Sequence, residues 1–455
     1  MSRTMTFGAS LMPSRPRVFG AAIVAGSLVS GAAFSVFAAK PEIFACVLGG
    51  IAALVALLLW PEFSLALYVV IGDVKGDERI ASLLPWDLTL ALGVVLVSGI
   101  FLNLLRGKRW VAMPPAYFLF IPLACLMTAS LSYTPVFEAG LEKLGRFLCV
   151  TSLAVIAPFF VLGTPQAMKR FLAGFALAAF TICAWSLHAL GGSERLVTPS
   201  ENTIGLGHIA CALVLLIWLC VIPRMAFPWR ALGYGLLAVA ALALVGSGSR
   251  GPAIACGVVL LVSLFCDRRR WIDLAVLGGI GFLALPFVKL PGSSIDYLGT
   301  LVASRSMDAL MSFRGDLLDN GWAILRQHPV LGIGIQGFRY GSPNPAVYNW
   351  PHNIFLEIAC ELGLPAALFA CAIFGSAIRE SFRQVRQHAE SYRDLARIAA
   401  ALLLVGIING TNTGDINSDR STWLFLSLVF VVRGYRLAYS NQAAQRMEAP
   451  RSLAA

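Results

Sequence analysis

A histidine, an asparagine and two glutamates lie within the segment Trp350–Gly363, which reads WPHNIFLEIACELG. Pro351 suits the first turn of a helix, where its missing N–H costs nothing, and Asn349 is a plausible cap. This places His352 at a helix N-terminus. The positive end of the helix dipole disfavours a second positive charge there and keeps the imidazole neutral, the state that a general base needs.

The polar residues Asn353, Glu357 and Glu361 recur every four residues and share one face of this helix. Ionisable groups in a membrane helix are costly and face the bundle interior or an aqueous cavity. Two interpretations stay open. The glutamates pair with an arginine such as Arg250 or Arg314, or they support catalysis at His352.

A single arginine, Arg250, occupies the short turn Gly246–Gly251. Membrane topology selects against basic residues in short outer loops, so this arginine calls for a reason. It is either a snorkelling arginine that binds lipid headgroups or part of an anion site at the outer membrane face.

Three other patterns carry less weight. Gly332–Gly337 matches GxGxxG, but it follows a helix rather than a strand, so we interpret it as a flexible turn. The acidic residues Asp73, Asp77 and Glu78 could bind a metal, although a solvated loop explains them better. No histidine pair has the spacing of zinc ligands, and no metal is expected.

The elements that must position these side chains are membrane helices. Of the 455 residues, 58% are hydrophobic and only 13% are charged, against about 25% charged residues in soluble chains. The apolar residues form long blocks, which predicts an all-α polytopic helix bundle with about 12–14 spans. Candidate spans lie at 18–39, 42–60, 62–72, 86–105, 113–132, 148–163, 171–190, 208–223, 231–246, 252–266, 272–288, 351–378, 395–410 and 422–438.

The basic residues predict the orientation. With the N-terminus inside, the inner side receives 22 of the 35 lysines and arginines and the outer side 13. By the positive-inside rule both termini are cytoplasmic. We predict one domain over 1–455, with a long periplasmic loop at 289–350 and a disordered cytoplasmic tail at 440–455.

The long loop contains a predicted surface helix at 313–328. Its residues Leu317, Leu318, Trp322 and Leu325 share a face, and Pro329 ends it.

Three segments together resemble the O-antigen ligase and polymerase superfamily of bacterial membrane glycosyltransferases. They are Ser247–Gly251, Arg314 with Trp322 leading into His328–Gly334, and His352–Glu357 with Glu361–Gly363. Their order and their predicted topology match the family over about residues 230–375, the predicted ligase-like core.

The resemblance implies a glycosyltransferase that moves a glycan from undecaprenyl diphosphate to an acceptor. It implies a catalytic histidine at His352 and diphosphate-binding arginines at Arg250 and Arg314, with Asn353, Glu357 and Glu361 as possible supporting residues. The expected reaction is inverting, needs no metal or other cofactor, and takes place at the periplasmic side of the bacterial inner membrane. The expected partners are the lipid-linked glycan, its acceptor and membrane lipid, without nucleic acid.

The acceptor stays open. If the acceptor is lipid A core, the protein is a ligase, which is the interpretation we favour. If the acceptor is a growing polysaccharide, it is a polymerase. If the acceptor is a protein, it is an O-oligosaccharyltransferase. A polysaccharide or lipid transporter is the rival from another class. Transporters place polar sites near the bilayer midplane and carry internal repeats, whereas here the polar residues lie near the outer face and no repeat is evident.

Overall fold

The described part of the chain is built from helices. The computed structural model describes residues 41–76, 87–189, 195–226, 228–266, 271, 308–341, 350–386 and 392–448, and these contain no β-strand. The chain divides into two compact units, Met1–Ala56 and Leu57–Ala455. Helix α2 (Pro41–Leu59) begins in the first unit. Every site discussed below lies in the second.

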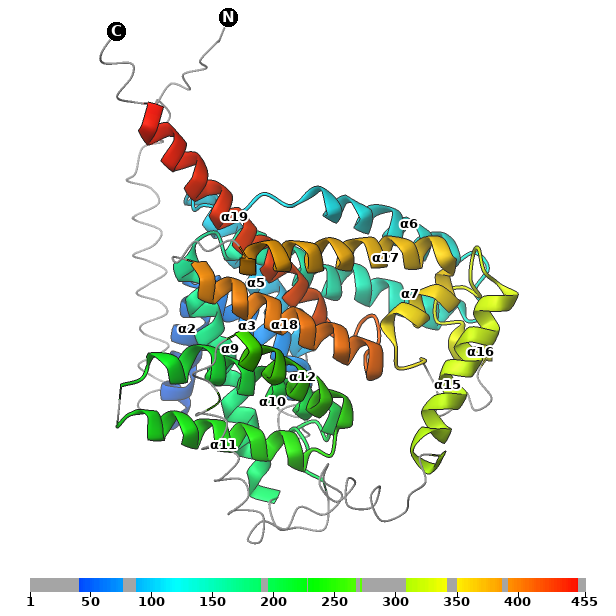
Figure 1. The fold of residues 1–455 in the computed structure, drawn as a ribbon, viewed down its shortest axis with the longest axis horizontal. Helices are drawn as coiled ribbons and strands as arrows, with labels where there is room; N and C mark the ends of the chain where they lie inside the picture. The colour runs from blue at the N-terminus through cyan, green and yellow to red at the C-terminus, as the bar shows by residue number, and fades with distance from the viewer. Residues whose placement is uncertain are drawn as a thin grey trace, which may run out of the picture. The chain divides into compact units, whose positions relative to one another are not determined.

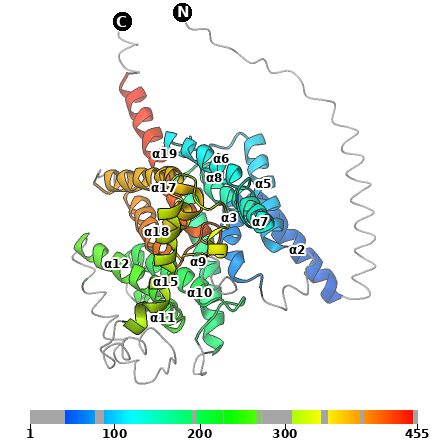
Figure 2. The same ribbon diagram turned by 90° about the vertical axis from the view of Figure 1, so that its right-hand side faces the viewer.

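The helices of the second unit are shown in Figures 1 and 2. The longer ones are α3 (Pro61–Val70), α5 (Leu88–Leu105), α6 (Phe120–Ser130), α7 (Phe137–Arg146), α8 (Ser152–Val161), α9 (Pro165–Ser186), α10 (Thr203–Leu216), α11 (Arg230–Gly246), α12 (Arg250–Cys266), α15 (Asp308–Gln327), α17 (Ile354–Arg386), α18 (Arg393–Asn412) and α19 (Arg420–Glu448). Short turns are η1 (Ile71–Asp73), η2 (Pro115–Leu119), η3 (Phe147–Thr151), η4 (Leu187–Ala189), η5 (Ile217–Val221), η6 (Ile222–Arg224) and α16 (Phe338–Gly341).

Six described helices are long and apolar enough to cross a membrane, and a seventh span results if the bent pair around Trp60 counts as one. Three shorter apolar helices, Pro115–Ser130, Arg230–Gly246 and Arg250–Leu264, coincide with predicted spans. The predicted polytopic all-α bundle is therefore confirmed. The predicted spans at 18–39 and 272–288 lie outside the described residues, so the count of 12–14 stays a prediction.

Helix α17 is broken at Gly363, whose φ is +85°. Pro365 has no N–H to donate to the carbonyl of Glu361, one helical turn earlier. The loop before α17 supplies hydrogen-bond donors at the break. Ile333 N and Gly334 N donate to the carbonyls of Cys360 and Glu361, respectively, both at 2.9 Å. These two carbonyls thereby gain partners from the loop, and Leu364 N donates to the carbonyl of Pro329 in the same loop at 2.9 Å.

The glycines of this loop are required by close packing. A Cβ on Gly332 would lie 2.3 Å from the carbonyl carbon of Glu361, and one on Gly363 would lie 2.0 Å from the carbonyl oxygen of Val330. The segment Gly332–Gly337 is a turn, as predicted, but its description as flexible is wrong, because backbone bonds fasten it to α17.

Helix α15 confirms the helix predicted in the long loop, and its packing corrects the predicted face. Leu317, Ile324 and Leu325 are buried against α16 and α17, whereas Leu318 and Trp322 are 36% and 51% exposed. Gly321 decides the register, since its missing side chain admits Leu356 of α17. Figures 1 and 2 show α15 against the first turns of α17.

Two helices extend beyond the predicted boundaries. Helix α19 runs to Glu448, so the first nine residues of the tail predicted as disordered are helical, in keeping with their good helix formers. Helix α7 begins at Phe137 and continues through η3 and α8 as one span to Val161. The prediction had started this span at 148.

We expect Gly363→Ala to destabilise the protein. An L-residue at this φ costs about 1–3 kcal/mol, and its Cβ would also collide with Val330. Thermal unfolding of the purified protein measures the effect. Gly375→Ala, on the same helix with no atom within 4 Å of the new Cβ, is the control. Equal unfolding temperatures for the two variants would contradict the description of the kink.

Candidate active site

His352 lies immediately before α17 in a conformation that few non-glycine residues adopt. Its φ is +54°. Asn353 is the cap: its Oδ1 accepts a hydrogen bond from Leu356 N at 3.0 Å, and its carbonyl accepts one from Glu357 N. The prediction that Asn349 caps the helix with Pro351 in its first turn is therefore wrong by several residues. His352 nonetheless stands at the N-terminal end of the helix, as predicted. Strained backbone of this kind is concentrated at functional sites.

The imidazole of His352 is half-buried and contacts the indole of Trp350. The indole Nε1–H donates to His352 Nδ1 at 3.2 Å, and the ring centroids lie 5.7 Å apart. This bond requires a lone pair on Nδ1, so in the neutral ring the proton resides on Nε2. Nδ1 is therefore the nitrogen with which this ring can accept a proton.

The two glutamates of the α17 stripe enclose Lys143 of α7. Lys143 Nζ lies 2.5 Å from Glu357 Oε1 and 2.7 Å from Glu361 Oε2, and the three side chains are at most 8% exposed. The glutamates do pair with a basic residue, as one of the two interpretations predicted, but the prediction that this residue is an arginine is wrong. The cation is a lysine from a helix far away in the sequence.

Each glutamate also binds a loop. Glu357 Oε2 accepts a hydrogen bond from Ile416 N in the connection between α18 and α19, and Glu361 Oε2 accepts one from Gln336 N in the loop before α17. The cluster of Lys143, Glu357 and Glu361 thus joins α7, α17 and two loops at one point. Its geometry is that of a structural clamp.

Arg250 is the first residue of α12, at the end of the turn that follows α11. Ser249 fastens this turn, because its Oγ donates to the carbonyl of Thr203 at 2.8 Å. Backbone N–H groups and the dipole of a helix N-terminus favour anions. The position therefore suits the anion site that Arg250 was predicted to form.

The ends of α12, α17 and α18 meet. A Cβ on Gly251, next to Arg250, would lie 3.0 Å from Thr413 at the end of α18. Gly410 and Gly414, beside Thr413, are equally close to Ile354, the first residue of α17. Arg250 and His352 are therefore at the same end of the helix bundle.

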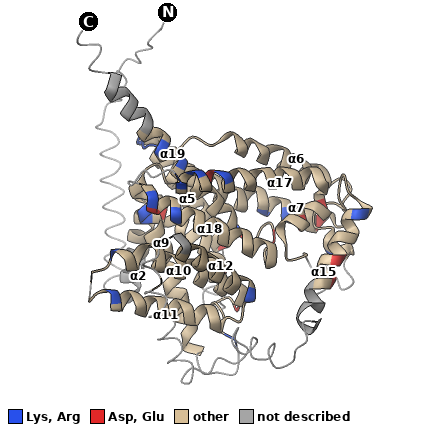
Figure 3. Cartoon of the chain, viewed as in Figure 1, with Lys and Arg blue, Asp and Glu red and all other residues tan. Residues whose placement is uncertain are grey.

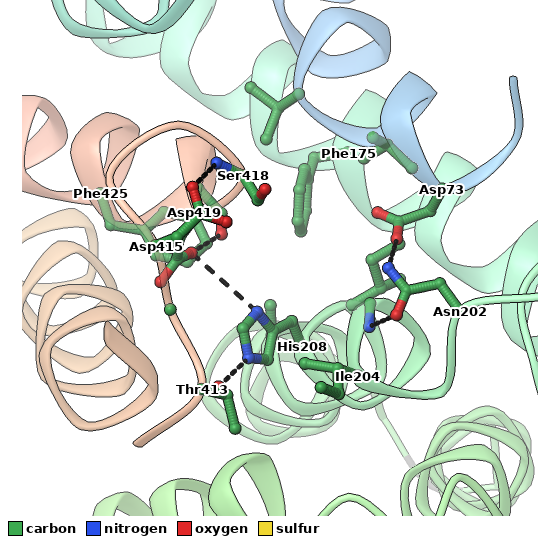
Figure 4. A pocket seen from close by; sticks show the side chains of 17 residues that line it. Asp73, Phe175, Asn202, Ile204, His208, Thr413, Asp415, Ser418, Asp419 and Phe425 are labelled. Atoms are coloured by element: carbon green, nitrogen blue, oxygen red, sulfur yellow. Dashed lines mark hydrogen bonds and ion pairs between the residues drawn. The ribbon is translucent and has the colours of Figure 1, made fainter. Parts of the chain in front are cut away.

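A polar cavity of about 100 Å³ opens beside these helix ends (Figure 4). His208 of α10 lies between Thr413 and Asp419, with Nε2 2.8 Å from Thr413 Oγ1 and Nδ1 4.0 Å from Asp419 Oδ1. On the facing wall, Asn202 Nδ2 donates to Asp73 Oδ1 at 3.3 Å. The hydroxyl, amide and carboxylate groups that line this cavity can form hydrogen bonds with a polyhydroxylated ligand.

The cavity corrects the interpretation of Asp73 as part of a solvated loop, because its carboxylate faces the cavity. Asp77 and Glu78 lie outside the described residues. Within the described residues, no group of three or more His, Cys, Asp or Glu side chains could hold a metal ion.

Arg314 lies on α15, two helical turns before Gly321, the residue that packs against Leu356 of α17. Its side chain is outside the described part of the structure. The structure thus relates Arg250 to His352 through the helix ends and leaves the position of the third predicted residue as a prediction.

Sequence reasoning missed Lys143 and most residues of the cavity; of the cavity residues it had singled out Asp73. Lys143 could have been found from the spacing of Gly140, Lys143, Leu144 and Phe147, which places the lysine on the apolar face of a helix; all four are buried. His208 and Asp419 carry no local signal, because they come together only through the packing of α10 against α18 and the position of the loop that follows α18.

The comparisons with known proteins bear on the same region. Residues 235–371 match the family model described as O-antigen ligase. This segment of the chain is therefore similar to that family. The match includes Arg250, Arg314 and His352, and it confirms the resemblance inferred from the three segments. A search of curated proteins finds no match. The match supports, in general terms, an enzyme of the O-antigen ligase and polymerase type. The apolar helices support a multi-pass membrane protein.

We expect Lys143→Met to destabilise the protein strongly. Removing the ammonium group leaves two buried carboxylates without their cation, which costs about 3–5 kcal/mol. Thermal unfolding in detergent measures the loss. Arg146→Met is the matched control, since Arg146 lies one turn further along and is 66% exposed in a pair with Glu142, a type of pair worth about 0–1 kcal/mol.

The same account predicts a partial rescue. Adding Glu357→Gln and Glu361→Gln to Lys143→Met removes the unpaired charges while each amide oxygen can still accept the loop N–H. Stability should rise above that of Lys143→Met alone. A triple variant less stable than the single one would contradict the clamp.

Proposed function

We propose that this protein is an inverting, metal-independent glycosyltransferase that moves a glycan from undecaprenyl diphosphate to an acceptor at the periplasmic face of the bacterial inner membrane. The observation that carries the proposal is the meeting of two helix ends within the O-antigen ligase domain. One begins with Arg250, and the other follows the strained His352. Both termini of the chain are cytoplasmic in this proposal.

His352 acts as the general base. The acceptor hydroxyl displaces the indole of Trp350 and gives its proton to Nδ1 as its oxygen attacks the anomeric carbon. The new glycosidic C–O bond forms while the bond between the anomeric carbon and the diphosphate oxygen breaks. Attack from the side opposite the leaving group inverts the anomeric centre.

Arg250 and Arg314 hold the leaving group. The breaking bond leaves its electron pair on undecaprenyl diphosphate, whose charge must be stabilised as it develops. Guanidinium groups bind phosphate oxygens in pairs, and the N-terminus of α12 adds backbone N–H groups. The glycan is already activated as a diphosphate ester, so the reaction needs no nucleotide.

The glutamates of the stripe act by position rather than by chemistry. Glu357 and Glu361 are occupied by Lys143 and by loop N–H groups, and Asn353 is occupied as the helix cap. They hold the end of α17 that presents His352. The polar cavity beside Arg250 supplies hydrogen-bonding groups suited to sugar hydroxyls.

For the acceptor we propose the lipid A core, as in O-antigen ligation. A growing polysaccharide or a protein hydroxyl would use the same residues. Lipopolysaccharide profiles of a deletion strain separate these cases. Loss of all capped chains indicates a ligase, capping with single units indicates a polymerase, and normal lipopolysaccharide with an unglycosylated protein indicates a protein oligosaccharyltransferase.

We expect His352→Ala to lower transfer by about 10²–10⁴-fold, the usual contribution of a positioned base. Product formation from a defined undecaprenyl diphosphate donor in proteoliposomes, without any gradient, is the measurement. His188→Ala is the control, because His188 is exposed and bonds to the carbonyl of Trp185. Wild-type transfer by a folded His352→Ala protein would refute the mechanism.

Trp350→Phe should have a small effect by comparison. It keeps an aromatic ring and removes the donor to Nδ1, a bond worth about 1 kcal/mol. Transfer should stay within tenfold of wild type in the same assay. A loss as large as that of His352→Ala would mean that the indole takes part in the reaction itself.

Arg250→Lys and Arg314→Lys should each lower transfer by at least about tenfold, because an ammonium group cannot make the paired bonds of a guanidinium. Arg326→Lys is the control for Arg314, since it is an exposed arginine on the same helix. If both lysine variants retained full transfer at limiting donor concentration, the assignment of the two arginines to the diphosphate would be wrong.

A further inference from the structure

A second polar cavity, of about 770 Å³, lies at the other end of the helices that carry the proposed active site. It is lined by the loop Gly107–Pro115, by Gly163–Pro165 after α8, by Tyr392, and by one side of α19 that includes Phe430, Arg433 and Tyr439. Arg433 follows Arg420, at the start of α19, by 13 residues, or about 20 Å along a helix. The cavity is therefore remote from His352 and Arg250.

Close contacts fix the position of the loop Gly107–Pro115, which lines the cavity. Val111 N donates to the carbonyl of Phe159 at 2.8 Å. A Cβ on Gly163 would lie 1.6 Å from the carbonyl oxygen of Arg109, and one on Gly434 would lie 2.2 Å from Val111 Cγ1. Two glycines thus allow the loop to lie directly on α19 and on the end of α8.

The charged side chains that line this cavity are all basic. Lys108, Arg109 and Arg433 line it, and no Asp or Glu is among its lining residues. Within the described chain, neither Lys108 nor Arg109 has a side-chain partner, whereas Arg433 lies 4.0 Å from Glu380. Figure 3 shows basic residues gathered near α19 and the end of α17. Such a cavity attracts an anion.

Aromatic side chains surround the cations. Trp110 and Tyr439 line the cavity and are 57% and 54% exposed, and Tyr392 and Tyr435 line it as well. Exposed tryptophan and tyrosine are typical of the interface between membrane and water. The cavity therefore opens at the depth of lipid headgroups.

An apolar groove continues from this cavity. The groove has a volume of about 740 Å³ and shares Met113 and Pro114 with the basic cavity. Phe118, Ile121 and Val155 are among its other walls, along η2, α6 and α8. A free phosphate would use the cations alone, whereas a lipid would fill both the cavity and the groove.

We propose that the basic cavity binds the headgroup phosphate of an anionic phospholipid, with an acyl chain in the groove. By the distribution of basic loops, this lipid belongs to the cytoplasmic leaflet. The site is independent of the glycosyl transfer proposed above.

The test is binding of dioleoylphosphatidylglycerol to the purified full-length protein in neutral detergent, followed by native mass spectrometry and by thermal unfolding. Dioleoylphosphatidylcholine and inorganic phosphate are the comparison ligands. We expect the anionic lipid to bind and to raise the unfolding temperature, and the other two to do neither. Lys108→Gln and Arg109→Gln should each weaken binding about fivefold, since a basic residue near a membrane surface contributes about 1 kcal/mol.

Arg106→Gln is the matched control, because Arg106 precedes the same loop, is exposed and does not line the cavity. Equal binding of the anionic lipid to Arg106→Gln and to the double variant Lys108→Gln/Arg109→Gln would overturn the proposal. Equal stabilisation by inorganic phosphate would overturn the lipid as the ligand. Both substitutions are at exposed side chains away from His352, so the outcome is separable from that of the transfer assay.

Discussion

One buried ammonium group between two buried carboxylates determines where the end of α17 lies. Lys143 comes from α7, and Glu357 and Glu361 come from the first two turns of α17. Charges in a membrane protein interior are tolerated only when they are paired and hydrogen-bonded. The cluster can therefore form only when α7, α17 and the two loops that donate to its glutamates are all in place. His352 is placed by the same helix end.

The break in α17 extends this constraint to the loop that precedes this helix. The carbonyls of Cys360 and Glu361 turn outward at Gly363 and bind the loop at Ile333 and Gly334. A polar defect in a membrane helix thus becomes the attachment point of the loop that contains α15. Because α15 also packs its Leu317 face on α17, the helix that carries Arg314 is tied to the helix that follows His352.

The sequence predicts well whatever depends on local pattern. The apolar blocks, the helix in the long loop, the stripe of Asn353, Glu357 and Glu361, and the exceptional positions of His352 and Arg250 are all readable from spacing and residue type. The cap of α17 was misplaced because Asn349 and Asn353 are both suitable caps, and only the observed hydrogen bonds distinguish them.

What could not be predicted depends on long-range packing. The cation that pairs with the two glutamates is Lys143, which lies more than 200 residues earlier in the chain. The sequence instead led us to predict one of the two arginines, Arg250 or Arg314. Likewise, the polar cavity joins Asp73, His208 and Asp419 from three distant segments. No local pattern relates such residues. The resemblance to the O-antigen ligase family led to the proposed site residues, but not to the ion cluster at the end of α17.

The central claim is that the ends of α12 and α17 together form the site for the lipid diphosphate. A cryo-EM structure of the protein with undecaprenyl diphosphate tests it most directly. We predict density for the diphosphate at the N-terminus of α12, in contact with Arg250 and facing the side chain of His352. Diphosphate density at the opposite end of the bundle, among Lys108, Arg109 and Arg433, would contradict the account.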